Sequence, residues 1–278
     1  MDWLTDSKIP VGKTGKTIFE WLRDNGSWFF ETVENVLDWV IELTLTILQF
    51  PHPLVMIAIF VAITWVIQKS WKTCVFVALG LLFVVNQGYW DETTESLTLI
   101  LFACLTCMAI GVPIGIAAAH RPKLYRAISP VLDLMQTLPT FVYLIPMIVF
   151  FGIGMVPGLV ATVIFVLPAP IRLTHLGVSS TPTALLEAAD AFGATPQQKL
   201  WKVELPYALP QIMTGLNQTI MLSLSMVVIA GLVGADGLGV PVVRALQQVN
   251  AAKGFESGLV IVVVAIVLDR MLRVEQKS

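Results

Sequence analysis

Residues 97–119 read LTLILFACLTCMAIGVPIGIAAA, a run of 23 residues without a charged side chain. As an α-helix this run is about 35 Å long, which is enough to cross the hydrocarbon core of a bilayer. The whole chain has the same character, because 56% of its 278 residues are hydrophobic and only 13% are charged. Soluble domains carry about 25% charged residues, so lipid must be the solvent for most of this chain. The sequence therefore predicts an all-α polytopic membrane protein.

Six further uncharged stretches bring the expected number of transmembrane helices to about seven. The stretch at 212–235 is as long as the first, whereas 54–67 and 73–85 are shorter. We expect the earliest span to begin near Leu43 and to kink at Pro51 and Pro53. The six stretches are 54–67, 73–85, 134–154, 155–171, 212–235 and 257–268.

The N-terminal tail, residues 1–50, contains the pattern of an amphipathic helix. Acidic residues recur at helical spacing, and apolar residues fill much of the remaining surface, which predicts a helix lying at the membrane interface. The acidic set is Glu31, Glu34, Asp38 and Glu42, and the apolar set is Trp28, Phe29, Val33, Val36, Leu37, Val40 and Ile41. The tail lacks the continuous apolar core of a signal peptide, so we expect no cleavage. A transmembrane domain at 51–272 and a short C-terminal tail at 273–278 follow.

The basic residues between the spans predict the orientation of the chain. The loops at 68–72, 120–130 and 172–211, together with the tail after 268, hold 11 Lys and Arg residues. The alternate loops, at 86–96, 152–158 and 236–256, hold 2. Because basic residues stay on the cytoplasmic side, we expect the N-terminus outside and both the 172–211 loop and the C-terminus in the cytoplasm.

Charge and cysteine content exclude several classes of protein. The formal net charge is −2, without the basic excess of a nucleic-acid-binding protein. Cys74, Cys104 and Cys107 all lie in apolar runs and predict no disulfide framework. Cys104 and Cys107 form a C-x-x-C on an uncharged helix with no nearby His, so we interpret them as small buried hydrophobes and expect no metal site.

The most informative stretch outside the spans is 181–206, TPTALLEAADAFGATPQQKLWKVELP. Its helix-capping and helix-ending residues predict two short helices that project from the membrane as a compact unit. The signals are Thr181 as a cap before Pro182, Gly193 as a left-handed stop, Thr195 and Gln198 in capping-box spacing, and Pro206 as the end of the second helix.

Within this loop, Glu187-Ala188-Ala189 is followed after three residues by Gly193 and after nine more by Val203-Glu204-Leu205-Pro206. This spacing resembles the cytoplasmic motif of the permease subunits of bacterial ABC importers, which has Ile where this chain has Val203. The resemblance implies a type I ABC importer permease fold, in which this loop docks in a cleft of the ATPase subunit. The implied ATPase-coupling residues are Glu187, Ala188, Ala189, Gly193, Leu205 and Pro206.

Three more stretches are similar to one branch of these permeases, which imports glycine betaine, choline, proline and related compatible solutes. They are LDLMQTLPTFVYLIPMIVFFGIG at 132–154, LPAPIRLTHLGV at 167–178 and NQTIMLSLSMVVIAGLVGADGLG at 217–239. The resemblance covers roughly residues 50–270. It implies a homodimeric permease of the bacterial inner membrane, fed by an extracytoplasmic substrate-binding protein. It also implies two ATPase subunits that hold ATP and Mg, whereas this chain binds no cofactor and is not an enzyme.

A polar lane on the 212–235 span is a candidate for the translocation pathway. Thr214, Gln218, Met221 and Ser225 share one helical face, and Asn217 lies beside them. Such a lane faces either a pore or a neighbouring helix, and the pattern alone leaves both open. We favour the pathway for Gln218, with Asn217 and Ser225 beside it. Candidates of the same kind on the 134–154 span are Gln136 and Tyr143.

An ion-coupled secondary transporter or channel is the alternative function. It would need ionisable residues within the membrane, and the long central spans lack them. Asp133 and Arg172 are expected at cytoplasmic ends of spans. An intramembrane enzyme has no supporting metal motif or nucleophile–base pair.

Three glycine-containing motifs have simpler interpretations. VGKTGKT at 11–17 lacks the glycine spacing of a phosphate loop, so we expect a flexible basic tail there. GADGLG at 234–239 is expected to break the 212–235 span at its outer end. Gly111 and Gly115 form a G-x-x-x-G that predicts close helix contact.

Overall fold

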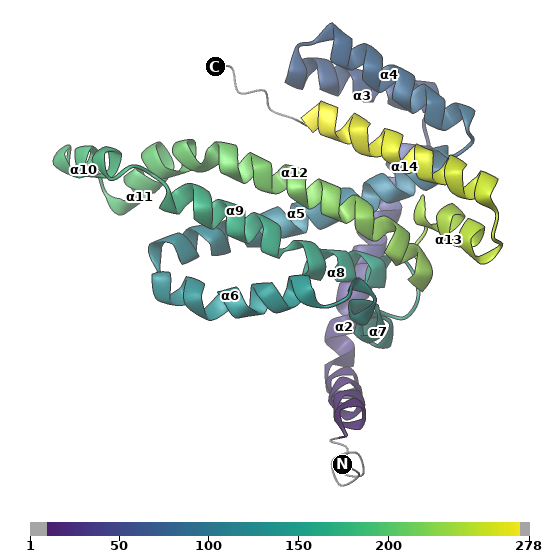
Figure 1. The fold of residues 1–278 in the computed structure, drawn as a ribbon, viewed down its shortest axis with the longest axis horizontal. Helices are drawn as coiled ribbons and strands as arrows, with labels where there is room; N and C mark the ends of the chain where they lie inside the picture. Colours follow the sequence, from purple (N-terminus) through teal and green to yellow (C-terminus); the bar gives the residue numbers. More distant parts are fainter. Residues whose placement is uncertain (1–9, 273–278) are drawn as a thin grey trace.

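A computed structural model describes residues 10–272, which are almost entirely helical and form no strand. Long helices lie alongside one another, while short ones cap both ends (Figure 1). The helices are α2 (Val11–Gln49), α3 (Pro53–Gln68), α4 (Trp71–Asn86), α5 (Trp90–His120), α6 (Pro122–Thr137), α7 (Thr140–Phe151), α8 (Met155–Val166), α9 (Pro168–Ser179), α10 (Thr183–Ala191), α11 (Pro196–Lys199), α12 (Leu205–Ala230), α13 (Gly239–Gln247) and α14 (Ala251–Leu272).

Helices α5, α9 and α12 form the centre of the molecule and pack against one another along much of their length. Helices α5 and α9 approach each other closely, because a Cβ at Gly115 would lie 2.7 Å from the carbonyl oxygen of Ile171. A Cβ at Gly111 would lie 2.8 Å from Cγ of Pro170. The two glycines therefore allow α9 to contact the α5 backbone directly, which confirms the close packing predicted from the G-x-x-x-G motif.

Prolines break the helical path at two places. Leu138 has an extended backbone (φ −65°, ψ 134°) because the following Pro139 disfavours the helical region there. As a result α6 and α7 meet at an angle of 96°. The expected span 134–154 is therefore not one straight helix. The expected earliest span is likewise divided, because α2 and α3 meet at 100° at the predicted prolines, and its first helix begins at Val11 and not near Leu43.

Within residues 10–272, four helical stretches are long and apolar enough to cross a membrane, and two of them join consecutive helices. Each bent pair adds a possible span, for a total of up to six. The four are Trp90–His120, Met155–Ser179, Pro196–Val233 and Ala251–Leu272. The remaining apolar helix, α4, has 16 residues and pairs with α3 as a hairpin beside α14. The count of seven spans and the side on which each terminus lies remain predictions.

Helix α2 runs across the long helices rather than along them (Figure 1). Its second half is anchored on α7, where the ring of Phe30 stacks on that of Phe150 at 4.6 Å between centroids. Ile41 is buried in the same cluster, with Tyr143 and Leu144. The expectation of a flexible tail at 11–17 is wrong, because these residues form the first turns of α2. A helix as long as 39 residues carries its own hydrogen bonds through this glycine-containing start.

Candidate functional site

The loop between α9 and α12 forms a projection at one end of the long helices, opposite α13 (Figure 1). Helix α10 leads out and α11 leads back, as the sequence predicted. Thr181, however, does not cap α10, because the helix begins at Thr183 with Pro182 at the cap position. The Thr181 hydroxyl is instead buried below the loop without a hydrogen-bond partner among the described residues.

Gly193 makes the turn between the two short helices. Its φ of +72° lies in the left-handed region, which L-residues with a side chain rarely adopt. The turn is closed by two backbone hydrogen bonds, in which Gly193 N–H donates to Asp190 O and Ala194 N–H donates to Ala189 O. A Cβ at Gly193 would meet no atom within 4 Å. The backbone conformation, and not lack of space within this chain, is therefore what requires glycine here.

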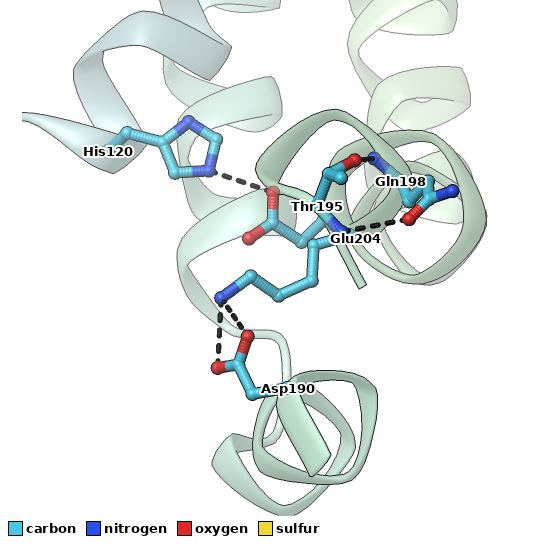
Figure 2. Close-up of polar contacts among 6 residues, drawn as sticks. His120, Asp190, Thr195, Gln198 and Glu204 are labelled. Carbon is cyan, nitrogen blue, oxygen red and sulfur yellow. Dashed lines mark hydrogen bonds and ion pairs between the residues drawn. The ribbon is translucent and has the colours of Figure 1, made fainter. Parts of the chain in front are cut away.

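The predicted capping box is confirmed (Figure 2). The Gln198 backbone N–H donates to Thr195 Oγ1 at 3.3 Å, and the Thr195 backbone N–H donates to Gln198 Oε1 at 2.8 Å. An ion pair joins the two arms of the loop, because Lys199 Nζ lies 2.8 Å from Asp190 Oδ1. Sequence reasoning missed this pair, since nothing local indicates which residues the turn brings together. The arms of the loop thus form one rigid unit.

The outer face of this rigid unit is unpartnered in the described chain. Glu187 and Ala188 are exposed, and Ala189 is half-buried. Phe192, at the end of α10, is 92% exposed. A large aromatic side chain left in water beside small alanines is typical of a binding surface, where aromatic residues act as anchors. Phe192 was also missed from the sequence, although it directly precedes the motif glycine.

The second arm does not end at Pro206, so that expectation is wrong. The chain continues from α11 through a π-helical turn at Leu200–Glu204 into α12. Within that turn, Leu205 N–H donates to Leu200 O, five residues back. Proline is compatible with this position because it occupies the first turn of α12, directly after the π turn. Leu205 is half-buried and Pro206 is exposed.

The candidate pathway residues fall into two groups. On α12, Gln218 and Ser225 are exposed and Asn217 is half-buried, so the lane points away from the core of this chain. The Ser225 hydroxyl donates to Met221 O in its own helix. Tyr143, by contrast, is buried on α7, and its hydroxyl donates to Met135 O across the α6–α7 bend. Gln136 is exposed near the end of α6.

The opposite end of α12 is closed by the predicted break. A short 3₁₀ turn at Gly231–Val233 leads to Gly234, whose φ is +80°. The following segment returns to α5, where Leu238 N–H donates to Ser96 Oγ at 2.8 Å. This confirms that GADGLG ends the long helix.

Comparison with known proteins places the chain in a family. Residues 111–275, which include the whole loop, match the family described as "Binding-protein-dependent transport system inner membrane component". The chain belongs to this family. As one of its members it is a permease subunit of an ABC transport system, a non-catalytic membrane component that works with an ATPase and a substrate-binding protein.

Three relatives are similar to this inner membrane component over most of its length. The glycine betaine/carnitine transport permease protein GbuB of Listeria monocytogenes is 46% identical over 90% of each chain. The glycine betaine transport system permease protein OpuAB of Bacillus subtilis is 43% identical, over 98% of this chain and 97% of the relative. The glycine betaine/proline betaine permease protein ProW of Escherichia coli is 40% identical, over 97% of this chain and 81% of the relative.

A solved structure supports the same assignment. The MetNI methionine ABC transporter, in an inward-facing conformation, contains a chain that is 28% identical to this one, with a TM-score of 0.58. The match covers 64% of this chain and 92% of that chain. This inner membrane component therefore has the type I ABC permease fold that the resemblance of its loop motif implied.

Proposed function

We propose that this chain is the membrane-spanning subunit of an importer for quaternary ammonium compatible solutes, with glycine betaine as the first candidate. The relatives that match it end to end are named for glycine betaine transport. We place the importer in the bacterial cytoplasmic membrane. The carried class extends in this proposal to choline and proline-type solutes, whose selection depends largely on the binding protein, where aromatic cages recognise quaternary ammonium groups.

The rigid, unpartnered loop between α9 and α12 is the observation that carries the proposed mechanism. We infer that Glu187, Ala188, Ala189 and Phe192 dock on the ATPase, with Gly193 fixing the angle of the docking helix. Because α11 leads through the π-helical turn into α12, the loop is joined directly to the base of the longest apolar helix. ATP and Mg bind to two copies of the ATPase, and their closure drives this chain between its inward-open and outward-open states.

The polar face of α12 supports a pathway shared by two copies of this chain. Thr214, Gln218 and Ser225 are exposed on it, although α12 belongs to the central helix pack. A polar lane directed away from the chain's own core needs a partner other than hydrocarbon. We propose that the same lane of a second copy faces it, with the solute passing between them.

Reconstitution tests this function. The chain is assembled with its ATPase in proteoliposomes, and glycine betaine uptake is measured with the binding protein and ATP. We expect uptake that stops with a non-hydrolysable ATP analogue and persists when ion gradients are dissipated by ionophores. Excess choline or proline betaine will reduce it if the substrate class is correct. Uptake that needs an ion gradient and ignores ATP would identify a secondary transporter instead.

Orientation is tested separately, by cysteine labelling in intact cells. A cysteine replacing Gln197 in the loop should react with a membrane-impermeant thiol reagent only after the cytoplasmic side is opened. A cysteine replacing Asp91, at the start of α5, should react from outside. The native Cys74, Cys104 and Cys107 are buried, so they give little background. The reverse pattern would place the loop outside the cell and remove it from the ATPase.

A further inference from the structure

A side-chain hydrogen bond joins α5 to the base of α12 directly beneath the loop between α9 and α12, which is the proposed coupling loop (Figure 2). His120 is the last residue of α5, and Glu204 is the last residue of the π-helical turn that leads into α12. Their side chains meet at 2.8 Å, between His120 Nε2 and Glu204 Oε2. The two residues are 84 positions apart in sequence. The contact therefore links the base of α12 to the end of a different long helix.

Glu204 depends on this contact because its side chain is only 9% exposed. A buried carboxylate without a partner is strongly unfavourable, whereas a charge-assisted hydrogen bond offsets the loss of water. His120 is 46% exposed and can reach solvent on its other side. The geometry is thus that of a buried acceptor held by a half-exposed donor.

The pair lies at a mechanically weak point in the path from the loop to α12. The π turn replaces the usual i−4 bonds with wider ones, such as Leu205 N–H to Leu200 O. Pro206 and Pro210 each lack an N–H, so neither can donate to the carbonyl four residues before it. By contrast, the loop itself is braced by the capping box and the Asp190–Lys199 pair. A force on the loop will consequently bend the chain near residues 200–210.

We propose that His120 and Glu204 are a pair of positioning residues that make α5 move together with the coupling loop. Ile116 and Ala119 of α5 also pack against a cluster that includes Ala208 and Ile212 of α12, but these α12 residues lie beyond the π turn. Without the pair, bending at the π turn would absorb part of the loop motion before it reached α5. With the pair intact, α5 follows the loop, and its glycine-mediated contact with α9 carries the motion into the central helix pack. The inference rests on the proposed function, because it assumes that the ATPase moves this loop.

The test uses the complete importer in proteoliposomes and measures ATP hydrolysed per glycine betaine imported. Measured on assembled complexes purified away from free ATPase, this ratio does not depend on how much of the variant folds. His120→Ala removes the donor, and we expect the ratio to rise about tenfold, the scale of losing one charge-assisted hydrogen bond. His120→Gln keeps a donor near the position of Nε2 and should restore a ratio close to that of the wild type. Lys123→Gln removes a neighbouring exposed cation and serves as the control for lost charge.

Each outcome decides between the alternatives. If His120→Ala assembles poorly, Glu204→Gln replaces it, because the amide keeps the shape while weakening the pair; a raised ratio is again expected. A wild-type ratio in both His120→Ala and Glu204→Gln would contradict the proposed role of the His120–Glu204 pair. The importer proposal would remain intact. Failure of the proposed function has a different signature: the wild-type assembly itself would show no ATP-dependent uptake.

Discussion

The coupling loop and the α5–α9 contact are both helical, yet they are held in opposite ways. The loop owes its shape to short-range features, namely a left-handed glycine, a capping box and one ion pair, and it leaves a hydrophobic face in water. The α5–α9 contact owes its shape to long-range packing, with backbone pressed against backbone at Gly111 and Gly115. Changes in the loop should therefore alter partner binding without unfolding the chain, and changes in the contact should do the reverse.

The largest expected effect is on the α5–α9 contact. Gly115→Ala places a methyl group 2.7 Å from Ile171 O, so α9 must shift. We expect a destabilisation of about 1–3 kcal/mol from overpacking, although alanine in an open helical site is favoured over glycine by about 1 kcal/mol. Thermal unfolding in detergent and the yield of folded protein in membranes measure it. Gly258→Ala on α14 is the control, since its methyl group would meet no atom within 4 Å. Equal stability of the two variants would show that the close contact is not required.

A smaller effect is expected at the exposed face of the loop. Phe192→Ala removes the proposed anchor while leaving the backbone of α10 intact. Because buried aromatic anchors dominate many interfaces, we expect the affinity for the ATPase to fall about tenfold with no change in thermal stability. The affinity is measured by titrating purified ATPase onto the chain in nanodiscs. Phe255→Ala is the control. Phe255 is 75% exposed, compared with 92% for Phe192, but it lies in the first turns of α14, outside the loop. Unchanged affinity for Phe192→Ala would move the docking surface elsewhere.

The smallest effect is expected on the polar lane of α12. Gln218→Leu leaves an exposed site filled but removes its amide from the proposed pathway. We expect glycine betaine uptake to fall several-fold, with assembly and ATP hydrolysis retained. Met221→Leu, on the same face, replaces one apolar side chain by another and should transport normally. Loss of assembly in Gln218→Leu would indicate a helix-packing role, and normal uptake would remove Gln218 from the pathway.

The same contrast explains how much could be predicted from the sequence. The structure of the loop could be predicted because its signals act over a few residues. Gly193 indicates the turn, and Thr195 with Gln198 indicates the start of the next helix. The long apolar runs likewise predicted most helices, since hydropathy needs no partner. The pairs Asp190–Lys199 and His120–Glu204 were not predictable, because they form only when the turn or the whole helix pack brings distant residues together.

Two other predictions were wrong because each misjudged the local effect of a proline. The expected span at 134–154 ignored Pro139, although a proline restricts the residue before it and here produces the α6–α7 bend. Pro206 was taken as a stop, but at the first turn of a helix proline is compatible with continuation. The pathway role of Tyr143 stays a prediction, whereas the contact of its hydroxyl with the Met135 carbonyl across the bend could not be seen in the sequence. A lack of charge identified apolar segments but not where they turn.

The central claim, that the α9–α12 loop transmits ATPase motion, is tested most directly by Gly193→Asp in the reconstituted importer. A side chain at φ +72° costs about 1–2 kcal/mol, and the added charge lies on the docking surface. Gly88→Asp is the matched control, because Gly88 has φ +79°, equally open surroundings and a place in the α4–α5 turn outside the loop. The account predicts that Gly193→Asp loses ATPase association or coupled uptake while Gly88→Asp retains both. Wild-type association and coupled uptake in Gly193→Asp would contradict it.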